Sequence, residues 1–173
     1  LGVPPVRKYQ SDGGPGILEV LEFLNGAVAP HEDRLAFMEA QIVFWLLAAI
    51  DGHAKNFSIF LSPGGYRLTP LYDVMSAASW PEFPDHKTKL AMAVGNKNHY
   101  RLKKIQLRHF YQTGQKAGLR EQDMDSIFSG LAAQMDDAIA EAATLAADAG
   151  MPESASDPIL AGVNKRAGMI GHP

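Results

Sequence analysis

The sequence predicts a mainly α fold with one short β-hairpin, and three patterns carry this prediction. Apolar residues recur at three- and four-residue steps over residues 30–50 and again over residues 121–149, as on the buried side of long helices. Between these stretches, two segments rich in β-forming residues, 57–61 and 66–70, flank the turn sequence Ser62-Pro63-Gly64-Gly65. We therefore expect a helical domain that one hairpin interrupts.

Shorter elements are expected around these three. Residues 1–16 have the composition of a loop, in which Asp12-Gly13-Gly14-Pro15-Gly16 indicates a tight turn or a backbone held close to another segment. A short helix should follow Pro15 and end at Asn25-Gly26. Prolines and the Gly95-Asn96 pair break any period over residues 77–101, which we expect to be irregular. Two further helices are predicted over residues 105–116 and 156–169.

Composition limits the class of protein. The 173 residues are 46% hydrophobic and 20% charged, as in one globular domain, which we place at residues 1–173. A net charge of -3 argues against a dedicated nucleic-acid binder but leaves room for a local basic patch. The absence of cysteine excludes disulfides and thiolate zinc sites, and it fits a reducing cytoplasm. No apolar run approaches the roughly 20 residues that a membrane span needs.

The most informative motif is Asp51-Gly52-His53-Ala54-Lys55-Asn56, directly after the apolar run at residues 44–50. A carboxylate at the end of a buried helix is costly unless it is paired or functional. Asn56 follows Asp51 by five positions, and a second acid, Asp73, comes after the predicted hairpin, which should bring the three side chains together. Protein kinases use this order: the first Asp takes the proton of the acceptor hydroxyl, and the Asn and second Asp hold Mg²⁺ on ATP.

Two cations lie within this motif, and His53 or Lys55 could offset the charge that develops on a transferred phosphate. Each residue also has a structural interpretation: a helix cap for Asp51, a satisfied polar residue for His53, a solvated charge for Lys55, and turn residues for Asn56 and Asp73. A zinc site using Asp51, His53 and Asp73 is a weaker alternative, because the sequence has no His-Glu-x-x-His motif and no cysteine.

These residues resemble the HipA family, bacterial toxin kinases that are paired with a DNA-binding antitoxin. The similar segments are residues 8–16, 44–58, 65–77, 89–93 and 108–110, so the resemblance covers roughly residues 7–150. It implies a fold like the helical larger lobe of protein kinases, with one hairpin carrying the catalytic and metal loops. It also implies a serine/threonine kinase that uses ATP and Mg²⁺ in the cytoplasm.

The resemblance also implies roles for single residues and for partners. Asp51 corresponds to the catalytic acid of the family, and Asn56 and Asp73 correspond to the metal ligands. His53 corresponds to a residue near the nucleotide phosphates, and we expect Tyr72, beside the metal ligand Asp73, to contact the nucleotide. The expected partners are an antitoxin of the HipB type and a protein substrate. Aminoacyl-tRNA synthetases are known family targets, so translation arrest is the expected output.

The sequence departs from the family in one respect. Family members carry a smaller N-terminal lobe with a phosphate-binding loop and an ATP-pairing lysine, and no such loop precedes Asp51 here. Residues 12–16 do not replace it, because they lack a following Lys-Ser/Thr. We therefore expect the sequence, which begins at Leu1, to be an excised part of a longer protein and to transfer phosphate poorly by itself. The alternative is a catalytically silent kinase-like fragment that binds protein or nucleic acid.

A basic stretch is the second signal for function. Between residues 86 and 110 there are seven lysines and arginines and no acid: Lys87, Lys89, Lys97, Arg101, Lys103, Lys104 and Arg108. A solvated face would explain them. The sharper interpretation is a surface for an anionic partner, such as operator DNA beside an antitoxin or the tRNA of a synthetase target, with binding that depends steeply on salt.

Overall fold

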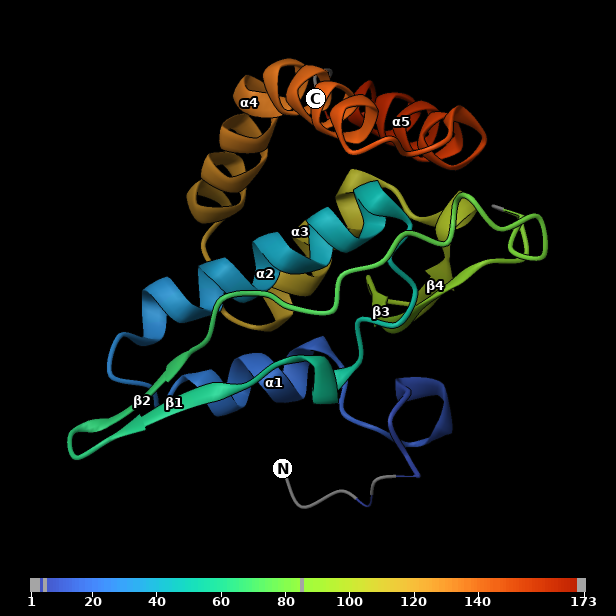
Figure 1. Ribbon diagram of the computed structural model, residues 1–173. Coiled ribbons are helices and arrows are strands. Elements are labelled where there is room, and N and C mark those ends of the chain that lie inside the picture. Colours follow the sequence, from blue (N-terminus) through green and yellow to red (C-terminus); the bar gives the residue numbers. More distant parts are fainter. Residues whose placement is uncertain (1–3, 5, 85, 171–173) are drawn as a thin grey trace.

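Helix α2, Pro30–Leu47, lies at the centre of the molecule, with α1, Ile17–Leu24, along one side of it (Figure 1). The computed structural model describes residue 4 and residues 6–84 and 86–170. Pro30 opens α2, and Glu32 and Asp33 lie in its first turn, where acids are favoured by the helix dipole. Its last turns are buried on all sides, as expected, with Trp45 1% exposed in the main core.

The carboxyl end of α2 is three residues earlier than expected. Ala48 adopts a left-handed conformation with φ of 54°, and this conformation ends the helix at Leu47. The chain then reaches Asp51 through a short loop of turns, followed by a single 3₁₀ turn, Ala54–Asn56. This turn leads directly into the first hairpin.

The first hairpin confirms the prediction. Strand β1, Ile59–Ser62, pairs antiparallel with β2, Gly65–Leu68, around a two-residue loop. Asp33 of α2 anchors the hairpin: its buried carboxylate accepts hydrogen bonds from the Arg67 Nε at 2.8 Å and from the Leu68 backbone N–H at 2.9 Å. The Tyr66 hydroxyl also donates to the carbonyl of Phe23 at the end of α1. The hairpin is therefore fixed to both helices.

A second hairpin corrects the expectation that residues 77–101 are irregular. Strand β3, Lys89–Val94, pairs antiparallel with the short β4, His99–Arg101, with an irregular register. Five of the six β3 residues are buried, so this strand lacks the alternation of polar and apolar residues that marks a surface strand. The breakers at residues 95–98 form the hairpin turn, where Gly95 and Asn98 take left-handed conformations.

The remaining helices close the core. Helix α3, Leu107–Lys116, and the 28-residue α4, Glu121–Asp148, match the expected ranges to within two residues. Helix α5, Glu153–Ala167, begins three residues earlier than expected and contains Pro158. It packs against both α4 and α2, and the Arg166 Nε donates a hydrogen bond of 2.8 Å to the Leu46 carbonyl.

The observed architecture confirms the mainly α class, with two hairpins in place of one. Within the described residues, none of the helices combines the length and the apolar character needed to cross a membrane.

Candidate functional site

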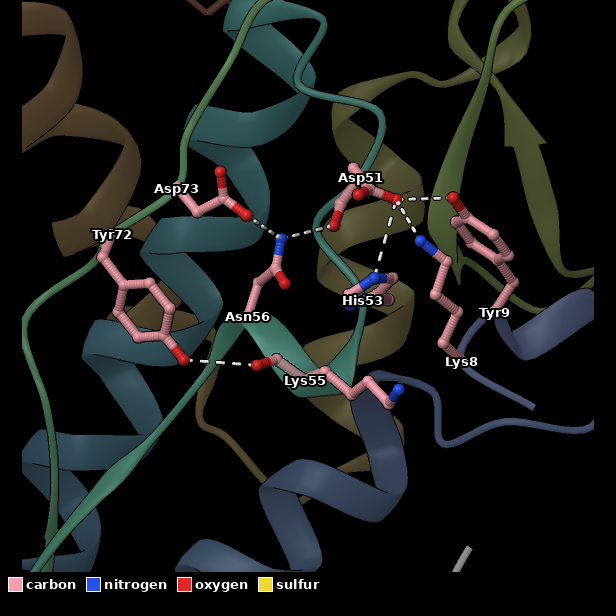
Figure 2. A network of polar contacts seen from close by, with 8 residues as sticks. All are labelled: Lys8, Tyr9, Asp51, His53, Lys55, Asn56, Tyr72 and Asp73. Atoms are coloured by element: carbon pink, nitrogen blue, oxygen red, sulfur yellow. Dashed lines mark hydrogen bonds and ion pairs between the residues drawn. The ribbon is translucent and has the colours of Figure 1, made fainter. Parts of the chain in front are cut away.

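Asp51, Asn56 and Asp73 lie together where α2, the 3₁₀ turn and the segment after β2 meet (Figure 2). The Asn56 side chain, 8% exposed, connects the other two residues. Its Nδ2 donates to the backbone carbonyl of Asp51 at 2.9 Å and to the Asp73 Oδ2 at 3.3 Å. Because Nδ2 is the donor in both contacts, the Asn56 Oδ1 remains as the free oxygen of the amide.

Local backbone geometry brings Asp73 to this position. The hairpin returns the chain to the start of the loop, and the Thr69 N–H donates to the Ser58 carbonyl at 3.0 Å beyond the last strand pair. Asp73 itself has a φ of 55°, a left-handed conformation that Asp tolerates better than most residues. The carboxylate is exposed to solvent, so an incoming ligand can reach it.

Asp51 has contacts of its own on the side away from Asp73. Its Oδ1 accepts a hydrogen bond from the Tyr9 hydroxyl at 2.5 Å and lies 3.4 Å from the Lys8 Nζ (Figure 2). The His53 Nε2 is 3.6 Å from the same oxygen. Burial would raise the pKa of Asp51, but the Tyr9 hydrogen bond and the positive charges of His53 and Lys8 outweigh it, so this pKa lies below its usual value. Asp51 is therefore ionised at neutral pH.

Tyr9 and Lys8 are functional candidates that the sequence analysis did not select. They lie more than 40 residues before Asp51, and their only signal was their place in the segment 8–16 that resembles the HipA family. The glycines of this segment give it its shape. A Cβ on Gly14 would lie 2.4 Å from the Arg7 carbonyl oxygen and 2.8 Å from that of Tyr9. The tight turn and the close backbone approach thus occur together, and they direct Tyr9 toward Asp51.

The other predicted residues surround this centre at different depths. His53 is 4% exposed, packs edge-on against the Tyr9 ring, and has no hydrogen-bond partner for Nδ1 in the described part of the chain. The Lys55 side chain is exposed, and its ammonium group points away from Asp73 in Figure 2. The Tyr72 hydroxyl donates to the Lys55 carbonyl at 3.2 Å and contacts the Ser58 hydroxyl at 2.8 Å. That His53, Lys55 and Tyr72 contact a nucleotide remains a prediction.

A pocket of about 470 Å³ opens beside Asp51. Tyr9, Phe83, Lys87, Lys89 and Tyr100 are among the residues that line it. It lies on the Tyr9 side of the carboxylate. Asp51 therefore has Asn56 and Asp73 on one side and an open pocket on the other.

The described residues contain no group of three or more His, Cys, Asp or Glu side chains that could hold a metal ion. This finding removes the support for a zinc site at Asp51, His53 and Asp73. A Mg²⁺ ion has different requirements, because it binds through one or two carboxylate or carbonyl oxygens and keeps waters and phosphate oxygens as its other ligands. The Asp73 carboxylate and the Asn56 Oδ1 fit that chemistry.

Comparisons with known proteins agree with this geometry. Residues 1–139 match the family model described as HipA-like C-terminal domain. Among curated proteins, the chain is 39% identical over 98 residues to "Putative kinase Y4mE" of Sinorhizobium fredii, covering 56% of this chain and 23% of that protein. It is 31% identical over 109 residues to the serine/threonine-protein kinase toxin HipA of Shewanella oneidensis, covering 54% of this chain and 24% of the toxin.

The fold is also similar to a solved structure. The HipA chain in a complex of Shewanella oneidensis HipA, HipB and operator DNA superposes with a TM-score of 0.80 at 20% identity, over 98% of this chain and 42% of that one. The chain spans about a quarter of the length of the curated relatives it matches. The family match over residues 1–139 and the common fold show that this chain belongs to the HipA-like C-terminal domain family.

Proposed function

We propose that this chain is the catalytic lobe of a HipA-like serine/threonine protein kinase, which transfers the γ-phosphate of ATP to a Ser or Thr of another protein. The observation that carries the proposal is the position of Asn56, whose amide contacts both the Asp51 carbonyl and the Asp73 carboxylate. A base and two hard oxygen ligands held around one amide are the parts that phosphoryl transfer needs from this lobe.

Asn56 and Asp73 would hold Mg²⁺, through the Asn56 Oδ1 and the Asp73 carboxylate. When bound, the ion would neutralise negative charge on the ATP phosphates. The hydrogen bond from the Asn56 Nδ2 to the Asp51 carbonyl restricts the rotamer of the amide, so less side-chain freedom would be lost when its oxygen binds the ion.

Asp51 would orient the acceptor hydroxyl and take its proton. The hydroxyl oxygen forms a bond to the γ-phosphorus, the bond from that phosphorus to the bridging oxygen of ADP breaks, and the proton passes to the Asp51 carboxylate. Its Oδ1 is engaged by Tyr9 and Lys8, which leaves Oδ2 for the acceptor. The lowered pKa of Asp51 makes it a weak base, which suits a loose transition state that depends on position more than on basicity.

The antitoxin is inferred from the similar structure, a complex of HipA with HipB and operator DNA, and the substrate from the resemblance to the HipA family. We propose that the full-length protein is the toxin of a toxin–antitoxin pair, that its antitoxin is of the HipB type, and that an aminoacyl-tRNA synthetase is a candidate protein substrate.

The test uses the full-length protein, ATP carrying a radioactive γ-phosphate, and a cytoplasmic extract of its host. The wild type should label a protein band only when Mg²⁺ is present. Asp51→Asn should abolish the labelling while the circular dichroism spectrum and melting temperature remain close to those of the wild type. Equal labelling by a folded Asp51→Asn variant would remove the role given to Asp51.

The second candidate is a binding role for the basic stretch, residues 87–108. All seven of its lysine and arginine side chains are exposed, and none forms an ion pair with an acid among the described residues. Exposed cations without an acidic partner favour a phosphate backbone. If nucleic acid binds here, its affinity should fall steeply as salt rises, and Lys103→Glu with Lys104→Glu should weaken it. An affinity that does not change with salt would exclude this role.

A further inference from the structure

A pocket of about 700 Å³ lies where the β3–β4 turn, the following 3₁₀ turn at Leu102–Lys104 and the start of α3 meet. Four exposed cations line it: Lys97, Lys103, Lys104 and Arg108. No acidic side chain lines it. Four like charges around one concave surface focus a positive potential on the space between them. We call it the 97–112 pocket, after Lys97 and Gln112, which are among the residues that line it.

Two histidines form part of its wall. The rings of His99 and His109 stack with their centroids 3.9 Å apart and their planes within 10° of parallel. His109 is 4% exposed, and its Nδ1 accepts a hydrogen bond from the Gln106 backbone N–H at 3.2 Å. The proton of the neutral ring is therefore on Nε2, and this N–H has no partner in the part of the chain that the structure describes. A buried side chain is held so that its donor is left free.

Gln112 is also held with its acceptor occupied. Its Oε1 accepts the Asn96 backbone N–H at 3.0 Å, so the amide NH₂ is the free end of the side chain. The neighbouring Gly95 N–H is held by the Thr113 hydroxyl at 2.8 Å, and Gly95 has a φ of 79°. Backbone N–H groups thus occupy the acceptors of His109 and Gln112, and the side-chain donors of these two residues remain for a ligand.

We propose that the 97–112 pocket is a binding site for phosphate groups, distinct from the site at Asp51; this rests on the second candidate function above and narrows it from the whole basic stretch to one concave site. The residues that contact the ligand are Lys97, Lys103, Lys104, Arg108, His109 and Gln112. Every free polar group among them is a donor, and a guanidinium and clustered ammonium groups are the side chains that bind phosphate best. The volume is within the range of pockets that hold small ligands. A metal cation is excluded by the charge of the lining.

Phosphate binding here should take up a proton. Burial lowers the pKa of His109, and the charges of His99 and Arg108 lower it further. The titratable and charged groups that face the ring pair are Lys97 from the β3–β4 turn, His99 from β4, Lys103 and Lys104 from the 3₁₀ turn, and Arg108 from α3. An anion in the pocket opposes these charges and raises the pKa of His109, so affinity should decrease as pH rises through the histidine range.

The experiment measures binding of inorganic tripolyphosphate, and separately of a 20-base-pair DNA duplex, to the full-length protein by calorimetry in EDTA. EDTA suppresses metal-dependent binding at the nucleotide site. The test variant carries Lys103→Gln and Lys104→Gln. The matched control carries Arg7→Gln and Lys116→Gln, which remove the same charge from exposed positions outside both the pocket and the basic stretch.

The test variant should weaken binding about tenfold or more, and the control should change it less than about threefold. Loss with tripolyphosphate alone identifies a free phosphorylated ligand, and loss with DNA identifies backbone phosphates. Affinity should fall between pH 6 and 8 by up to about tenfold per unit, the limit for one linked proton, and His109→Gln should flatten this profile. Equal losses in the two double variants, or no binding of either probe, would overturn the proposal.

Discussion

Asn56→Asp is the substitution that tests the central site most directly, because it changes a donor into an acid with little change in shape. In the native protein the Asn56 Nδ2 donates to the Asp73 Oδ2 at 3.3 Å and to the Asp51 carbonyl at 2.9 Å. In the variant both contacts bring oxygen against oxygen, and the contact with Asp73 joins two negative charges. The folded state should therefore be destabilised when no cation is present.

The distance sets the magnitude. Coulomb's law gives about 5 kcal/mol for two unit charges 3.3 Å apart at an effective dielectric constant of about 20, and about 1.3 kcal/mol in bulk water. Asp73 is exposed, so the repulsion should lie toward the lower value. Loss of the hydrogen bond to the Asp51 carbonyl adds about 1 kcal/mol. The free energy of unfolding should thus fall by about 2–4 kcal/mol in EDTA.

Magnesium should reverse much of this loss. A cation that binds only the folded state stabilises it by about 1.4 kcal/mol at ten times its dissociation constant and by about 2.7 kcal/mol at a hundred times. The variant places two carboxylates at the site, so it should gain more from added Mg²⁺ than the wild type gains.

Urea unfolding followed by tryptophan fluorescence measures these quantities, since Trp45 lies in the core. Asn164→Asp, on the exposed side of α5, is the matched control, and it should change the free energy of unfolding by less than about 0.5 kcal/mol. An Asn56→Asp protein as stable as the wild type in EDTA would refute the contact with Asp73. A variant that is destabilised but indifferent to Mg²⁺ would refute the cation site.

Three further predictions follow from other contacts. Tyr9→Phe removes the hydrogen bond that lowers the pKa of Asp51, so phosphate transfer by the full-length protein should slow by about tenfold. The ionised Asp51 stabilises the fold above the pKa that this residue has in the unfolded chain, and this contribution is lost as pH falls through its pKa in the folded protein. The variant should show a smaller contribution of this kind. An unchanged rate and acid profile would contradict the role of Tyr9. Burial and the hydrogen bond to Asp125 raise the pKa of Tyr111 to about 12, so stability should fall as pH rises from about 10 toward 12, and Tyr111→Phe should lose the last component of the ultraviolet absorbance titration. Asp33→Ala removes the acceptor of the Leu68 N–H and of the Arg67 Nε. It should lower the melting temperature by on the order of 5 °C and speed amide exchange in β1 and β2, whereas exposed Glu39→Ala should do neither.

The sequence was enough to predict that Asp73 lies near Asn56, because the two residues are joined by one short hairpin. A two-residue hairpin loop between strands of four residues returns the chain to its starting point, so Asp73 had to lie close to Asn56. The long helices could also be predicted, since their apolar positions repeat with the period of an α-helix.

The contacts of Asp51 with Tyr9 and Lys8 could not be found in this way. No periodicity relates residues that are 42 positions apart, and the contact depends on the path of a loop shaped by Gly13 and Gly14. Strand β3 was not predicted for a different reason. It is buried on both faces, which removes the alternation that identifies a strand, and the Gly95-Asn98 turn looks like a general interruption of structure until its partner strand is seen.

Helix α5 lies beyond the end of the family match but packs against the helix that leads to the site. The family match stops at residue 139, within α4, yet Arg166 of α5 donates a hydrogen bond to the Leu46 carbonyl in the last turn of α2, directly before the loop that carries Asp51. A protein shortened to residue 139 would keep every motif residue but lose this hydrogen bond and the packing of α5, so the last turn of α2 would fray. Anyone expressing this domain for biochemistry should therefore choose its length from the helices and not from the alignment.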